Sequence, residues 1–225
     1  MKPSSQSAGY TKIIPVLSVL LLTVWSFPAC KAKLQAQSAN PPGMAPAGEP
    51  NRQGSEEGRR LFLRGITEFE FGNYEHAAEL LADASDLMGE NASASLDYTL
   101  AETFLELDDE SNALFYAEQA VEKEGGNKWY RIKLAEVYRI LGRSDDSIAE
   151  LEESLKITPG DVDVLYTIAR IHGLSGDYEQ ANETYNRIIN YTGSNLQVLY
   201  HKYQNFTMMG DEERAIGQLE EILEL

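Results

Sequence analysis

A small residue that follows a short turn recurs at a nearly constant interval along most of the chain. These small residues are Ala77, Ala113, Ser147, Ala181 and Ala215, separated by 36 residues once and by 34 residues three times. In four of the five copies a glycine stands five positions before the small residue. A fixed interval of this length indicates a stack of similar units that share one core, because one such unit cannot bury its apolar face alone.

The fourth copy indicates what one unit contains. Leu165, Ile168 and Ala169 lie three or four positions apart in its first half, and Ala181 and Tyr185 lie four positions apart in its second half. Such spacing predicts two amphipathic helices joined by a short turn. We expect Ala169 and Ala181 where the two helices cross closely, because both are small.

Four polar residues precede segments with helical spacing: Asp161, Asp177, Asn195 and Asp211. Their side chains can accept hydrogen bonds from free N–H groups of the first helical turn. We therefore expect each of them to be the N-cap of a helix.

The interval and the residues within it resemble the tetratricopeptide repeat (TPR) family over residues 58–225. The fourth unit has the family's Leu, Ala, Gly, Tyr, Ala, Tyr signature in register. The second unit departs from it at Asp97, where a large apolar residue is usual, and at Asp108, where the turn glycine is usual. The resemblance implies an all-α fold, a right-handed α-solenoid of about five helix-turn-helix repeats. Those repeats span residues 58–91, 94–127, 128–161, 162–195 and 196–225.

The first 30 residues are typical of an export signal. Two lysines precede an uncharged, mainly apolar stretch at 13–29, and Cys30, the only cysteine, follows directly. The sequence around Cys30 resembles a bacterial lipoprotein box, so we predict lipidation at Cys30 and a membrane anchor there. The alternative is ordinary signal cleavage just before Gln37, which would remove Cys30.

Residues 31–57 are rich in Pro, Gly, Ala, Ser and Gln, and predict a disordered, flexible linker. The first 55 residues have a formal charge of +4, so the rest of the chain accounts for −21 of the total of −17. Together these features favour an exported periplasmic protein or outer-membrane lipoprotein of a Gram-negative-type envelope. A eukaryotic secreted protein glycosylated at Asn91, Asn182 and Asn205 is an alternative.

Composition and motifs argue against several classes of activity. A net charge of −17 argues against nucleic acid as the main partner. The sequence has no phosphate-binding glycine loop, no nucleophile elbow and no zinc-protease motif. Its three histidines, His76, His172 and His201, are not spaced as a metal site. We therefore predict no enzyme activity, no cofactor, no metal and no catalytic residue.

The resemblance implies a partner-binding groove lined by the first helix of each repeat. In the family, partner-facing side chains occupy the second, fifth, ninth, twelfth and thirteenth places of a repeat. The fifth places hold Phe62, Tyr98, Ile132, Tyr166 and Tyr200, an expected aromatic ladder. Phe62 and Phe69 fit core packing equally well. The predicted groove residues are Tyr98, Trp129, Arg139, Tyr166, Arg170, Tyr200 and Gln204.

The sequence thus predicts a non-catalytic scaffold or adaptor that binds a protein or peptide segment in the concave groove. The residue types at the fifth and ninth places do not favour capture of a terminal carboxylate by lysine and asparagine, as chaperone-binding relatives do. The alternatives are a glycan-associated accessory lipoprotein and the N-terminal part of a larger TPR protein. The sequence stops at Leu225 without a polar capping helix, so we also expect an exposed apolar edge there, which would allow self-association.

Overall fold

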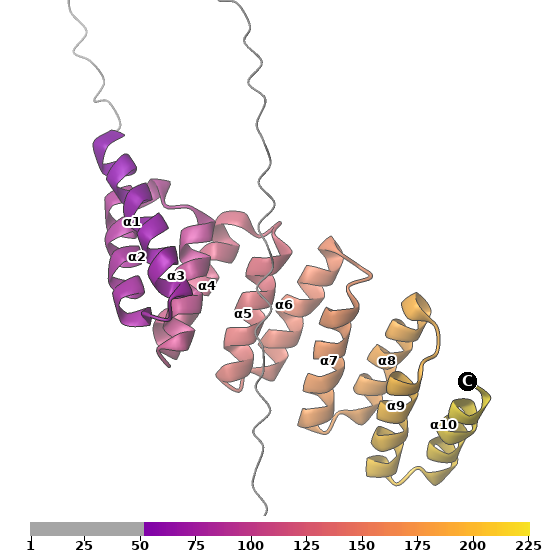
Figure 1. Ribbon diagram of the computed structural model, residues 1–225. Coiled ribbons are helices and arrows are strands. Elements are labelled where there is room, and N and C mark those ends of the chain that lie inside the picture. The colour runs from indigo at the N-terminus through magenta and orange to yellow at the C-terminus, as the bar shows by residue number, and fades with distance from the viewer. Residues whose placement is uncertain (1–51) are drawn as a thin grey trace, which may run out of the picture. The chain divides into compact units, whose positions relative to one another are not determined.

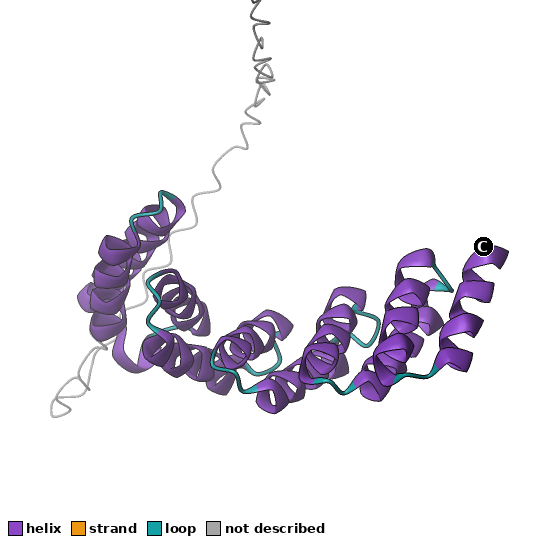
Figure 2. Cartoon of the chain, turned by 90° about the horizontal axis from the view of Figure 1, so that it is seen from below, coloured by secondary structure: helices purple, strands orange, loops and turns teal. Residues whose placement is uncertain are grey.

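The computed structural model describes residues 52–225 as ten α-helices and one short 3-10 helix. Consecutive α-helices pack in antiparallel pairs that follow one another along a curved row (Figures 1 and 2). The predicted signal at 1–30, Cys30 and most of the predicted linker lie outside the described residues. The helix pairs are α1 (Arg52–Glu70) with α2 (Tyr74–Met88), α3 (Ala94–Glu106) with α4 (Glu110–Glu124), α5 (Lys128–Ile140) with α6 (Ser144–Ile157), α7 (Val162–Ser175) with α8 (Tyr178–Thr192), and α9 (Leu196–Met209) with α10 (Glu212–Glu224); the 3-10 helix η1 (Gly89–Asn91) follows α2.

The predicted α-solenoid is confirmed, with one helical hairpin for each predicted repeat. The first helix is longer than expected, because α1 begins at Arg52 inside the predicted linker 31–57. Pro50 is the last proline before this helix, and residues 52–70 contain no proline. Each backbone N–H of α1 is therefore present to form a helical hydrogen bond. Within residues 52–225, no helix is long and apolar enough to cross a membrane.

The small residue of each repeat is buried at the crossing of its hairpin. Ala77, Ala113, Ser147, Ala181 and Ala215 are all buried. On the facing first helices, Ala135 and Ala169 are buried as well, as expected for Ala169. The hydroxyl of Ser147 donates a 2.7 Å hydrogen bond to the backbone oxygen of Ala135, which joins α6 directly to α5.

All four expected residues are the N-caps of their helices. Asp161, Asn195 and Asp211 accept hydrogen bonds from the backbone N–H three residues further on, at 3.3, 3.0 and 3.0 Å. The side-chain hydrogen bond expected of Asp177 is absent. Instead its backbone N–H donates to the oxygen of His172 at the end of α7, so Asp177 closes the turn through its backbone.

The two irregular residues of the second repeat have structural explanations. Asp97 is only 2% exposed, and the amino group of Lys123 on α4 lies 2.6 Å from its carboxylate. A charged pair within the hairpin therefore replaces the usual apolar contact. Asp108 has a φ of 55°, in the left-handed region that the turn glycines of the other repeats also adopt.

Candidate binding groove

A groove of about 510 Å³ lies between the third and fourth hairpins. Its walls come from the first helices α5 and α7, and residues of α6 form its floor. Trp129 and Ile132 give it an apolar wall, and Trp129 is 59% exposed. The Lys128 ammonium lies 4.6 Å from the centre of the Trp129 ring, so the ring has a cation on one side. An open aromatic surface of this kind can pack against a side chain of a partner.

A second segment of about 780 Å³ lies between the fourth and fifth hairpins, bordered by α7, α8 and α9. Asp163, Thr167 and Arg170 line both segments. The two segments therefore adjoin at α7, between α5 and α9. We call them together the first-helix groove.

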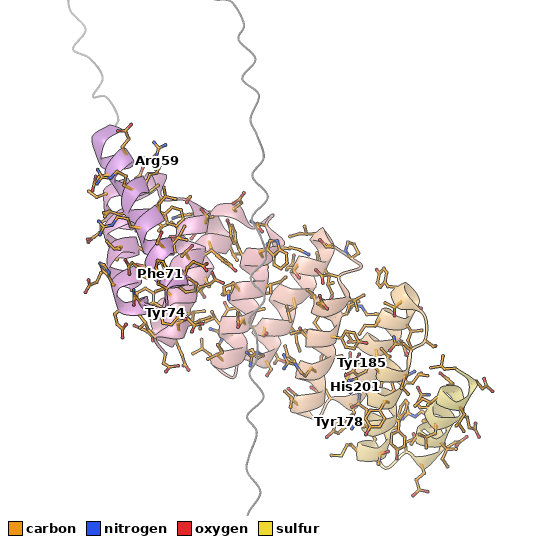
Figure 3. All side chains as sticks on the ribbon, viewed as in Figure 1. Arg59, Phe71, Tyr74, Tyr178, Tyr185 and His201 are labelled. Carbon is orange, nitrogen blue, oxygen red and sulfur yellow. The ribbon has the colours of Figure 1, made fainter. Side chains whose placement is uncertain are left out.

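Three rings pack together in the second segment. The Tyr185 ring is stacked on His201 with 5.4 Å between centroids, and Tyr166 meets Tyr185 edge-on at 6.2 Å. Figure 3 shows Tyr185 on α8 beside His201 on α9. Burial raises the pKa of the Tyr185 hydroxyl, and the neighbouring Tyr166 raises it further, whereas Arg170 lowers it. Tyr185 is therefore uncharged at neutral pH.

The carboxylates and cations that line the groove are only partly paired with one another. Asp161 is bonded to Lys128 at 2.7 Å, and Glu136 is bonded to Lys133 at 2.7 Å. Among the residues that the structure describes, Arg139 and Arg170 form no ion pair. The groove therefore offers two guanidinium groups whose charge no described side chain neutralises.

Five of the seven predicted groove residues line this groove: Trp129, Arg139, Tyr166, Arg170 and Gln204. The other two lie elsewhere. Tyr98 donates a 2.8 Å hydrogen bond to Glu102 of its own helix and packs against Tyr130. Tyr200 is 49% exposed and lies beside His201, on α9.

The aromatic ladder does not form as one line of rings. Phe62 packs against the core of the first two hairpins, as does Phe69, so the core interpretation holds for both. Each tyrosine of the ladder contacts a ring outside the ladder: Tyr98 contacts Tyr130, and Tyr166 contacts Tyr185. Position along a first helix determines the face of a side chain, but not the neighbour that covers it.

Several groove residues were not predicted. Asp163 and Gln197 occupy the second place of their repeats, so the family pattern that selected Trp129 would have found them. Thr167, His201 and Asn205 lie one place beside the family's positions, and no sequence signal indicates them. The hydrogen bond from the Asn205 amide to Asn182 also shows that Asn182, which is buried, is not an accessible glycosylation site.

The described part of the chain has no cluster of three or more His, Cys, Asp or Glu side chains that could hold a metal ion.

The last helix, α10, has an exposed apolar surface. Its residues Ile216, Leu219 and Leu223 are exposed, so the expected apolar edge is present. Self-association through that edge stays a prediction.

Two family profiles match the chain in sequence. Both are described as Tetratricopeptide repeat, one over residues 130–161 and one over residues 163–191. The chain contains tetratricopeptide repeats. Among solved structures, MamA is 14% identical to this chain, with a TM-score of 0.65 over 75% of this chain and 91% of MamA.

Two other solved structures have the same fold. A fragment of MamA from Desulfovibrio magneticus RS-1 is 12% identical, with a TM-score of 0.62 over 76% of this chain and 95% of the fragment. YrrB, described as a TPR protein with an unusual peptide-binding site, is 19% identical, with a TM-score of 0.57 over 66% of this chain and 75% of YrrB. No curated protein matches this chain in sequence. At these identities the structural neighbours show the fold alone.

Proposed function

We propose that this protein is a non-catalytic adaptor that binds an extended segment of a partner protein in its first-helix groove. The observation that supports this most directly is that two segments of the groove adjoin at α7, where the same three residues line both. An extended polypeptide needs such a track, because its successive side chains must be received at separate points along it.

The side chains of the second segment suit a polypeptide backbone. Gln197, Gln204 and Asn205 line it, and an amide side chain can both donate to a carbonyl and accept from an N–H. An extended segment has unpaired backbone groups of both kinds. The description of YrrB as a TPR protein with a peptide-binding site is consistent with this use of the fold.

The glycan-binding alternative receives less support. Recognition of sugars through the aromatic ladder needs a row of exposed rings, but Tyr98 is bonded within its own helix and Tyr166 is packed on Tyr185. Trp129 is the one residue of the groove that offers a largely exposed ring. A polypeptide uses the whole groove, whereas a sugar would use this ring alone.

We further propose that the protein is exported to a Gram-negative-type envelope and anchored by a lipid at Cys30. Support comes from the sequence: two lysines, an apolar stretch at 13–29 and the cysteine that follows it. Mass spectrometry of the protein extracted from membranes tests this directly. A mature N-terminus at Cys30 with added acyl mass is the expected result, and a chain that begins at Gln37 would contradict it.

The binding proposal is tested by crosslinking and recovery of the tagged full-length protein from its native membranes. The groove variant combines Tyr166→Ala, Arg170→Glu and Gln204→Ala. The control variant combines Glu183→Ala, Asn186→Ala and Asn190→Ala, three exposed positions on α8. We expect a defined protein to be recovered with the wild type and the control but not with the groove variant, whose helicity is checked by circular dichroism. Equal recovery with all three would refute the groove as the binding site.

A further inference from the structure

The groove contains two cations without an ion-pair partner, although the protein as a whole is strongly acidic. The chain has a formal net charge of −17. Five of its described arginines form ion pairs with carboxylates of the same chain. Arg131 pairs with Glu150 at 2.8 Å, for example, and Arg214 pairs with Glu179 at 2.8 Å. Arg139 on α5 and Arg170 on α7 are exposed, line the groove and have no such partner among residues 52–225.

The charged side chains that line the groove are three basic and three acidic, but they are not all paired. Asp161 is bonded to Lys128, and Glu136 is bonded to Lys133, which also pairs with Glu102 at 3.2 Å. Arg139 and Arg170 are thus the two cations of the groove that no carboxylate of the described residues pairs with.

The chemistry of these groups defines what they can bind. A guanidinium pairs with a carboxylate through two parallel N–H···O hydrogen bonds, which are shorter and stronger than bonds between neutral groups. Both arginines line the same segment as Trp129 and Ile132, whose apolar surface lies open beside them. Anionic and apolar groups of one ligand can thus be received next to each other.

We propose that the groove selects segments with internal Asp or Glu side chains, which pair with Arg139 and Arg170, beside an apolar side chain that packs on Trp129. This inference rests on the proposed function, since it names the class of segment that the groove binds. It differs from capture of a chain end, because side-chain carboxylates are bound and a free C-terminus is not required.

The test is a selection of random 12-residue peptides on the purified full-length protein. Each peptide is displayed with flanking sequence on both sides, so that no terminal carboxylate is available. The same library is selected on the double variant Arg139→Gln/Arg170→Gln and on Arg64→Gln. Arg64 is the control, because it is exposed on α1, away from the groove, and its change removes one positive charge, as each single change of the double variant does.

We expect Asp and Glu to be enriched about fivefold over the library in peptides selected on the wild type and on Arg64→Gln, but not on the double variant. For an enriched peptide, each Arg→Gln change should raise Kd about tenfold, which corresponds to about 1.4 kcal/mol. Replacing the peptide's own Asp and Glu by Asn and Gln should weaken binding to the wild type by a similar factor.

Two different results would overturn the inference, and they can be told apart. If peptides are selected by the wild type but without acidic enrichment, or if the enrichment persists in the double variant, the charge preference is wrong while the groove remains a peptide site. If the wild type selects no peptide at all, the proposed function fails, and the inference fails with it.

Discussion

The backbone at Asp108 has a conformation that suits glycine better than any L-residue. Its φ is 55°, and the equivalent turns of the other repeats use Gly72, Gly142, Gly176 and Gly210 with φ between 72° and 85°. Asp108→Gly should raise the free energy of unfolding by about 0.5 to 1 kcal/mol, because the Cβ that opposes this conformation is removed. A urea titration followed by circular dichroism measures the change.

The matched control for this prediction is Asp108→Ala. It removes the carboxylate but keeps the Cβ, so no gain in stability is expected. A gain of the same size in both variants would mean that the charge of Asp108, rather than its backbone conformation, limits stability.

The buried ion pair of the second repeat should make the stability of a lysine variant depend on pH. Asp97 is buried, and Lys123 is its ion-pair partner at 2.6 Å. Lys123→Met should lower the free energy of unfolding by about 2 kcal/mol at pH 7, because it leaves a buried carboxylate without a partner. Lys156→Met is the control, since the Lys156–Glu153 pair lies on the surface and should matter little.

The direction of the pH dependence follows from the pKa of Asp97. Burial raises this pKa above its usual value, and Lys123 only partly opposes the shift. The folded state therefore holds the proton more tightly than the unfolded state, so the contribution of Asp97 to stability falls as pH rises through the interval between the two pKa values. In Lys123→Met the folded pKa rises further. The loss of stability in this variant should thus become smaller as the pH is lowered from 7, and a loss that stays constant would contradict this explanation.

At the scale of helices, each hairpin depends on small residues where its two helices cross. Ala169 on α7 is buried at such a crossing, with Ala181 on α8. Ala169→Leu should lower the free energy of unfolding by about 1 to 3 kcal/mol, because a larger side chain forces the helices apart. Glu183→Leu, an exposed change on α8, should have little effect in the same urea titration. Equal effects of the two variants would show that the crossing tolerates extra volume.

Helices and hairpins could be predicted because they depend on local spacing, whereas the groove depends on contacts between repeats. The 34-residue interval identified every hairpin, and the family's places found Trp129, Arg139 and Arg170. Tyr98 does not line the groove, and its hydroxyl donates to Glu102 one turn away, a contact that the family's places do not indicate. Spacing alone also cannot show that Lys123 compensates Asp97, since they lie on different helices.

At the scale of the whole molecule, the excess of negative charge should oppose folding. The formal charge of −17 means that acidic side chains repel one another at low ionic strength. Salt at 0.1 M screens this repulsion between charges that lie more than about 10 Å apart. We expect Tm to rise by about 2 to 4 °C, about 1 kcal/mol, between roughly 20 and 300 mM NaCl. Thermal unfolding followed by circular dichroism checks this. A fall in Tm would show that the ion pairs between the helices outweigh the general repulsion.

The central claim is that a partner segment lies in the first-helix groove, and site-specific photo-crosslinking in intact cells tests it most directly. The crosslinking residue replaces Thr167, which lines both segments of the groove, or Asn186, an exposed residue of α8, as the control. The account predicts a crosslinked product of one defined mass from position 167 and none from position 186. The same product from both positions, or from position 186 alone, would contradict it.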